Sequence, residues 1–182
     1  MRRERTRAME IILQVNGRER TWETAPGELL IDTLRRNGFY GVKRGCETGD
    51  CGVCAVLLDG RAVNPCVTFT GSAAGRKILT IEGLAPEGLA PPEGLHPIQQ
   101  AFLDCGAVQC GFCIPGMILV AQELLAENPG PTEADVRKAL AGVLCRCTGY
   151  RKPVEAVLTA ARRMRDGAGS AAATQGGGGA SS

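Results

Sequence analysis

The sequence predicts an α+β protein built from two small units, a strand-rich first half and a helical second half. In the first half, the apolar residues Ile11, Leu13 and Val15 recur at every second position, which is the period of a strand with one buried face. In the second half, apolar residues recur at helical spacing. Between the two, residues 83–96 contain three Pro and three Gly without periodicity, as expected for a linker.

The strand-rich half begins with a predicted hairpin. Asn16-Gly17 follows the first alternating segment directly, and Asn-Gly is typical of a two-residue turn because both positions take positive φ. The returning strand is predicted over Arg18–Thr24. Pro26-Gly27 ends that strand, and a helix is predicted over Glu28–Asn37, with Gly38 as its stop. A Gly- and Cys-rich loop is predicted over Gly41–Cys54. Three strands complete the unit, over Val53–Leu58, Arg61–Phe69 and Lys77–Ile81.

Four helices are predicted in the second half. Apolar stripes begin at Ile98 and at Ile114. Thr132 and Asp135 form a capping box ahead of the third helix, and Pro153 suits the first turn of the fourth. The third stripe is expected to carry Val136, Leu140, Val143 and Leu144.

These elements predict the domain boundaries. Residues 10–82 form the first domain, residues 83–96 the linker, and residues 97–166 the helical domain. Residues 1–9 are expected to be a disordered extension. The Gly/Ala/Ser-rich residues 167–182 are expected to be a disordered tail.

Composition excludes several function classes. A formal charge of +2 and an aromatic content of 4% argue against a nucleic-acid-binding surface. No segment approaches the ~20 apolar residues of a membrane-spanning helix, and no signal peptide is recognisable, so a cytoplasmic protein without membrane insertion is expected. Nine cysteines, an odd number, favour metal binding over disulfides in that compartment. The single histidine excludes zinc sites that need more than one and a Rieske centre.

A first set of cysteines has the spacing C-x₄-C-x₂-C followed by a fourth: Cys46, Cys51, Cys54 and Cys66. This spacing is typical of a plant-type [2Fe–2S] cluster. The loop glycines Gly45, Gly49 and Gly52 allow the backbone to wrap the inorganic sulfides closely and to aim N–H groups at them. The alternative is a structural zinc site, which usually has two C-x₂-C pairs and leaves the glycines without a role.

A second set lies in the helical half as a C-x₂-C and a C-x-C pair: Cys110, Cys113, Cys145 and Cys147. Two pairs on separate helical hairpins can converge as four thiolates, and the spacing permits zinc as well as an iron–sulfur cluster. Both pairs are expected near helix N-termini, whose partial positive charge suits an anionic group. The ninth cysteine, Cys105, falls on an apolar stripe and is predicted to be a core residue. His96 is predicted to be a surface or capping residue.

Three motifs, taken together and in order, resemble a known family. The strings GCETGDCGVC, QCGFCIPGM and CRCTGYR closely resemble the small iron–sulfur subunit of the molybdenum hydroxylases, which include xanthine dehydrogenase, aldehyde oxidoreductase and aerobic carbon monoxide dehydrogenase. The resemblance covers about residues 10–163. It implies a β-grasp ferredoxin-like domain followed by a four-helix-bundle domain, each with one [2Fe–2S] cluster.

The resemblance also implies ligands and partners. A proximal cluster, nearest a molybdopterin on a large subunit, would be held by Cys110, Cys113, Cys145 and Cys147. A distal cluster, toward FAD on a medium subunit, would be held by Cys46, Cys51, Cys54 and Cys66. Gln109 is implied to hydrogen-bond the pterin, and Cys147 is implied to approach it.

The implied function is electron transfer from the molybdopterin to flavin or another acceptor. No G-x-G-x-x-G follows a strand and no P-loop is present, so neither flavin nor nucleotide has a motif on this chain. Substrate chemistry is therefore expected on another subunit. Xanthine or another purine is the first expectation for its substrate, with aldehydes, N-heteroaromatics and carbon monoxide open. A free-standing two-cluster ferredoxin and a zinc-binding structural module are the alternatives of other classes.

Overall fold

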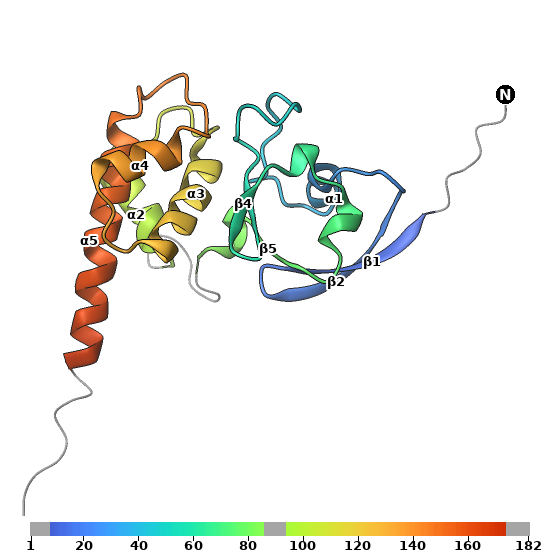
Figure 1. Ribbon diagram of the computed structural model, residues 1–182, viewed down its shortest axis with the longest axis horizontal. Helices are drawn as coiled ribbons and strands as arrows, with labels where there is room; N and C mark the ends of the chain where they lie inside the picture. The colour runs from blue at the N-terminus through green and yellow to red at the C-terminus, as the bar shows by residue number, and fades with distance from the viewer. Residues whose placement is uncertain (1–7, 86–93, 174–182) are drawn as a thin grey trace, which may run out of the picture.

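The computed structural model describes residues 8–85 and 94–173 of the chain. Two units lie side by side, a small sheet with one α-helix on it and a bundle of helices (Figure 1). The sheet unit contains β1 (Met9–Val15), β2 (Arg18–Thr24), α1 (Leu30–Arg36), β3 (Val56–Leu58), β4 (Arg61–Val63), the 3-10 helices η1 (Pro65–Val67) and η2 (Thr70–Ala73), β5 (Lys77–Leu79) and the 3-10 helix η3 (Ile81–Gly83). The bundle contains α2 (Pro97–Asp104), α3 (Ile114–Glu127), α4 (Glu133–Leu140) and α5 (Arg151–Ala173).

The sheet has the strand order β2-β1-β5-β3-β4. β1 pairs antiparallel with β2 through the predicted hairpin, where Asn16 and Gly17 have φ of 52° and 76°. β1 also pairs in parallel with β5, so the first and last strands of the unit lie side by side. α1 occupies the middle of the predicted helix, and its buried face joins the sheet in one core: Leu13, Val15, Leu30, Ile31, Leu34, Val56, Leu58 and Ile78. The unit is the expected β-grasp.

Three strands are shorter than the sequence predicts, among them β5, which ends at Leu79 instead of Ile81. β3 begins only at Val56, and β4 ends at Val63 although the pattern predicts a strand as far as Phe69. Pro65 has no N–H group to donate and a fixed φ, so the chain turns there into η1. This turn carries Cys66 into the interior, where it is 3% exposed.

The bundle helices begin at side-chain caps. Thr132 Oγ1 accepts from the Asp135 N–H (3.2 Å), and the Asp135 carboxylate accepts from the Thr132 N–H (2.9 Å), which confirms the predicted capping box. At α2, His96 Nδ1 accepts from the Ile98 N–H (3.3 Å), which confirms His96 as a capping residue. Within the two described ranges, no helix is both long and apolar enough to span a membrane.

Two features of the bundle differ from the prediction. α4 ends at Leu140, so Val143 and Leu144 lie on the following loop instead of the helix. Val143 is nevertheless buried, whereas Leu144 is 57% exposed. α5 runs on to Ala173, so residues 167–173 continue a helix where the composition predicts disorder. Alanine is the strongest helix former, which favours this extension. Residues 174–182 and 86–93 lie outside the described residues.

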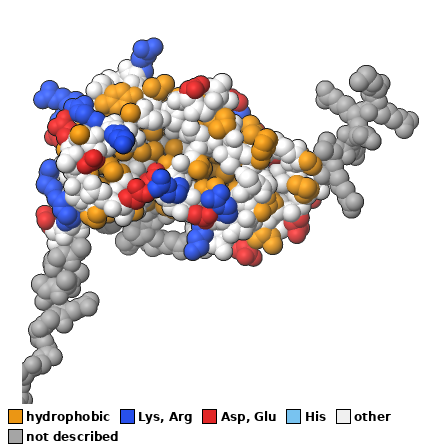
Figure 2. Space-filling model, in the orientation of Figure 1, with side chains coloured by type: hydrophobic (Ala, Val, Ile, Leu, Met, Phe, Trp, Pro, Cys, Tyr) orange, Lys and Arg blue, Asp and Glu red, His pale blue; other side chains and the backbone are white. Residues whose placement is uncertain are grey.

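The two units share a contact. Val53, from the sheet unit, is buried in the core of the bundle, and Leu79 and Ile81 pack against that core. Beside this contact lies a cleft of about 620 Å³ between the β3–β4 hairpin and α3 and α4. Arg61 spans it and forms ion pairs with Glu123 (3.0 Å) and Glu127. On the face drawn in Figure 2, acidic and basic side chains are interspersed over both units.

Candidate metal centres

The first set of thiols gathers beside the sheet. Cys46, Cys51 and Cys54 lie on the loop between α1 and β3, and η1 brings Cys66 to them. Cys54 and Cys66 are buried and in contact with each other. Cys46 is exposed and Cys51 partly exposed, and the backbone N–H of each donates to the sulfur of the other (3.4 Å each). The set, which we call the distal site, therefore consists of an inner and an outer pair.

The distal loop directs its backbone amides at sulfur. The Thr48 N–H also donates to Cys46 Sγ (3.4 Å). Glu47 and Gly49 have φ of 60° and 88°, which folds the loop back around the thiols. A Cβ on Gly45 would lie only 2.9 Å from Cys51 Sγ, so a side chain there would crowd the outer pair. The predicted role of glycine, close wrapping, fits this geometry at Gly45 and Gly49.

The two distal pairs differ in their electrostatics. Hydrogen bonds from Thr48 and from the backbone of Cys51 lower the pKa of the exposed Cys46 thiol to about 6. Burial raises the pKa of the Cys54 thiol to about 12, and the neighbouring Cys66 thiol contributes to the rise. A metal must therefore displace a proton from the inner pair on binding.

The second set, which we call the proximal site, gathers at the top of the bundle. Cys110 and Cys113 lie between α2 and α3, with Cys113 at the N-cap of α3, and Cys145 and Cys147 lie between α4 and α5. Cys110 and Cys147 are exposed, with their sulfurs 3.6 Å apart. Cys113 is buried and contacts the partly exposed Cys145. This site also has an outer and an inner pair.

Thr148 supplies both a backbone and a side-chain partner for a sulfur of the proximal site. The Thr148 N–H donates to Cys145 Sγ (3.4 Å), and Thr148 Oγ1 lies 3.1 Å from the same sulfur. Burial raises the pKa of the Cys145 thiol, but the bonds from Thr148 outweigh it, and the net pKa is lowered. Burial raises the pKa of Cys113 to about 12. Thr148 is not among the site residues that the sequence predicts, and its only signal there is its place directly after C-x-C.

The donor sets fit [2Fe–2S] clusters. In such a cluster each of two irons is bound by two thiolates, and the paired arrangement in both sites matches that division. A zinc site instead needs its ligands around one ion. Among residues 8–85 and 94–173, no three His, Cys, Asp or Glu side chains are grouped so as to hold a single metal ion. Both sites present pairs of thiols with hydrogen-bond donors aimed at sulfur.

The two thiol loops touch through their backbones. The Leu144 N–H, next to Cys145, donates to the carbonyl of Cys51 (2.8 Å). Gly52 lies against this segment: a Cβ there would be 2.0 Å from the Gly142 carbonyl oxygen. Gly116, three residues after Cys113, is also close to this loop: its Cβ would lie 2.8 Å from the Gly52 carbonyl oxygen. The sequence treats the loops as parts of separate domains, and only the folded chain brings them together.

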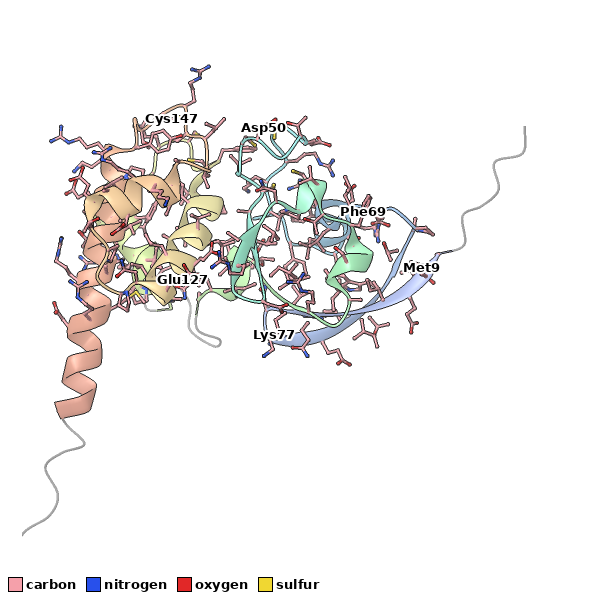
Figure 3. The ribbon with its side chains drawn as sticks, viewed as in Figure 1. Met9, Asp50, Phe69, Lys77, Glu127 and Cys147 are labelled. Carbon is pink, nitrogen blue, oxygen red and sulfur yellow. The ribbon has the colours of Figure 1, made fainter. Side chains whose placement is uncertain are left out.

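The remaining predicted residues lie as follows. Gln109 is exposed and immediately precedes Cys110 of the outer proximal pair. Cys105 is partly buried at the end of α2 and packs against the bundle core, with its sulfur 3.8 Å from Thr159 Oγ1. Both thiol loops reach the same edge of the molecule, where Asp50 and Cys147 are labelled in Figure 3.

Fold and sites together define a two-domain protein that binds two [2Fe–2S] clusters. Residues 13–77 match the family described as a 2Fe-2S iron-sulfur cluster binding domain. Residues 80–158 match the family described as a [2Fe-2S] binding domain. The chain belongs to the small iron–sulfur subunits of the molybdenum hydroxylases, which are oxidoreductases.

Individual relatives support this membership. The chain is 47% identical to the nicotine 6-hydroxylase small subunit of Paenarthrobacter nicotinovorans, over 84% of this chain and 89% of that one. It is 44% identical to the xanthine dehydrogenase iron-sulfur-binding subunit of Escherichia coli O157:H7, over 79% and 89%. It is 46% identical to the aldehyde oxidoreductase of Megalodesulfovibrio gigas, over 82% of this chain and 16% of that longer one. The solved quinoline 2-oxidoreductase of Pseudomonas putida 86 superposes with a TM-score of 0.81 at 39% identity, over 88% and 98%.

Proposed function

We propose that this chain relays electrons from a molybdopterin on a large partner subunit, through the proximal and then the distal cluster, to FAD on a medium subunit or to another acceptor. The observation that carries the proposal is the backbone contact between the two thiol loops. Through it the carbonyl of Cys51 meets the N–H next to Cys145, so the two ligand sets are joined by one hydrogen bond. Each bound cluster would take up and release one electron at a time.

The ligand roles follow the two pairs of each site. Cys46 and Cys51 would hold one iron of the distal cluster and the buried Cys54 and Cys66 the other. In the proximal site the outer pair and the inner pair would do the same: Cys110 with Cys147, and Cys113 with Cys145. The backbone and hydroxyl donors at Cys46 and Cys145 stabilise negative charge on sulfur, which favours the reduced form.

We propose that the molybdopterin subunit binds at the outer proximal pair. Exposed apolar residues lie next to the proximal cysteines in the sequence: Val108, Phe112 and Leu144 are 37%, 46% and 57% exposed. Apolar side chains beside a redox site favour a permanent protein contact that excludes water. Gln109, exposed beside Cys110, would offer its amide to the pterin, and the exposed Cys147 would approach it.

The substrate that we propose for the assembled enzyme is a nitrogen heteroaromatic, with xanthine or another purine as the first compound to test. Nicotine, xanthine and quinoline, the compounds in the names of three relatives, are all of this class. An aldehyde is the second candidate, because the aldehyde oxidoreductase is as similar in sequence. The cysteines are all free, which suits a cytoplasmic complex.

The experiment is purification of the native complex under non-denaturing conditions. We expect the chain to elute with a molybdenum-containing subunit, and each candidate substrate is then tested for bleaching of the cluster absorbance. In the Gln109→Ala complex the iron content should be unchanged, but substrate should reduce the proximal cluster more slowly. Gln100→Ala is an equal truncation on α2, and it should leave the rate of this reduction unchanged. Elution as a free chain of ~19 kDa would favour the free-standing ferredoxin. Zinc in place of iron would favour the structural module.

A further inference from the structure

Tyr150 is an unusual residue at the edge of the proximal site. It is the last residue before α5 and has φ of 66°, in the left-handed region that side chains with a Cβ disfavour. A bulky non-glycine residue in this conformation persists only where its surroundings hold it there. Gly149, immediately before it, has φ of 59°, so two consecutive residues are left-handed and only the first is a glycine.

The hydroxyl of Tyr150 holds both ends of a short segment. The Cys145 N–H donates to Tyr150 Oη (2.8 Å), and the Tyr150 hydroxyl donates to the carbonyl of Val143 (3.1 Å). Leu144 lies between these two residues, and its N–H is the donor to the Cys51 carbonyl. One hydroxyl therefore fixes the segment that joins the proximal thiols to the distal loop.

The backbone of Tyr150 also orients a donor to sulfur. Its N–H donates to Thr148 Oγ1 (3.2 Å). A Cys145 thiolate that holds iron carries no proton, so the Thr148 hydroxyl, 3.1 Å from this sulfur, would be the donor of that pair. Tyr150 thus acts on Cys145 from two directions, through the amide and through the sulfur, without being a ligand.

We propose that Tyr150 is a positioning residue that tunes the proximal cluster and keeps its loop in register with the distal loop. Without the phenolic hydroxyl, the Val143–Cys145 segment loses its anchor. The donors to Cys145 Sγ then become less ordered, and weaker hydrogen bonding to sulfur lowers the reduction potential of an iron–sulfur cluster. The proposal rests on the proximal ligand set of the proposed function.

The test is Tyr150→Phe in the full chain loaded with iron and sulfide. Tyr40→Phe is the matched control, because Tyr40 is the other tyrosine, is 61% exposed, and its hydroxyl has no hydrogen-bond partner in the described part of the chain. Redox titration followed by EPR should show a lower proximal midpoint potential in Tyr150→Phe, with the distal potential unchanged. Hydrogen exchange of the peptide that contains Leu144 should be faster in this variant than in the wild type and in the control.

The outcomes separate this inference from the proposed function. A wild-type chain without a proximal [2Fe–2S] signal would overturn the ligand assignment itself. A normal wild-type signal with unchanged proximal potential and exchange in Tyr150→Phe would overturn the role of Tyr150 alone. Loss of the proximal cluster in Tyr150→Phe, with the distal one kept, would support the role. Tyr150→Gly relieves the backbone strain but also lacks the hydroxyl, so it should show the same lower potential if the hydroxyl is the cause.

Discussion

The distal and proximal sites show two ways of building the same donor set. The distal site draws three thiols from one glycine-containing loop, and the backbone of that loop supplies the donors to Cys46 and Cys51. The proximal site closes between two loops at helix ends, and its donors to sulfur come from Thr148, whose hydroxyl Tyr150 orients. The first arrangement is local in sequence, whereas the second depends on the packing of the bundle.

Loss of one buried thiol in each site is the most severe test of this comparison. Cys54→Ser and Cys113→Ser each remove an inner ligand whose surroundings exclude water. We expect each variant to lose the cluster of its own site, to halve the iron content, and to keep the EPR signal of the other cluster. Disappearance of both signals in one variant would show that the sites assemble together through the contact between Cys51 and Leu144.

A side chain at the junction of the two loops is the next largest perturbation. Gly52 and Gly60 have φ of 66° and 84°, but a Cβ on Gly52 would lie 2.0 Å from the Gly142 carbonyl oxygen, whereas Gly60 faces open space. Both alanine variants share the left-handed strain, on the order of 1–2 kcal/mol. Overpacking should cost Gly52→Ala about 1–3 kcal/mol more.

Urea unfolding of the iron-loaded variants measures this difference. Equal loss of stability in Gly52→Ala and Gly60→Ala would mean that the two loops separate without cost, and that the backbone contact is not what joins the sites. A larger loss in Gly52→Ala, with both clusters retained, would locate the junction at this glycine.

The sequence predicts the distal site better than the proximal one for a physical reason. The C-x₄-C-x₂-C spacing and its glycines lie in one loop, so the pattern itself indicates the cluster type. The proximal spacing is equally compatible with zinc, and the pairing of Cys110 with Cys147 arises only when α2, α3, α4 and α5 pack. Tyr150 gave no periodic signal, because its role depends on a left-handed backbone and on contacts within a folded loop.

In the fold, too, local features could be predicted from the sequence and tertiary contacts could not. The Asn16-Gly17 hairpin and the Thr132 capping box are local, and both were predictable. The early end of β4, two residues before Pro65, could have been anticipated from the missing N–H group of Pro65, but the inward turn of Cys66 could not. The insertion of Val53 into the bundle core is a tertiary contact that no periodicity indicates.

The outer distal thiol offers a milder test, by pH, in the iron-free chain. The pKa of Cys46 is lowered to about 6, so its thiolate predominates at neutral pH and alkylation should rise through pH 6 and then level off. Cys54, with a pKa of about 12, should stay unreactive over the same range.

Thr48→Val serves as the variant for this pH profile, because the Thr48 side chain is the largest cause of the shift. Loss of this hydroxyl, which also donates to the Asp50 carboxylate, should move the Cys46 alkylation midpoint to higher pH, since the thiolate loses a donor. Mass mapping of the modified peptides identifies the cysteine. An unmoved midpoint would assign the lowered pKa to the backbone amides alone.

The smallest effect is expected at the cleft between the two units. Arg61 pairs there with Glu123 and Glu127, but its side chain is 69% exposed, and exposed ion pairs contribute only about 0–1 kcal/mol. Arg61→Ala should therefore lower stability less than Gly52→Ala, lose its effect at high salt, and leave both EPR signals unchanged. Arg76→Ala, which breaks an exposed pair with Asp59 inside the sheet unit, is the matched control and should cost a similar amount. If Arg61→Ala alone destabilised the chain as strongly as Gly52→Ala, the two units would be held together by charge across the cleft. The backbone contact between the thiol loops would then be a consequence of their docking and not its cause.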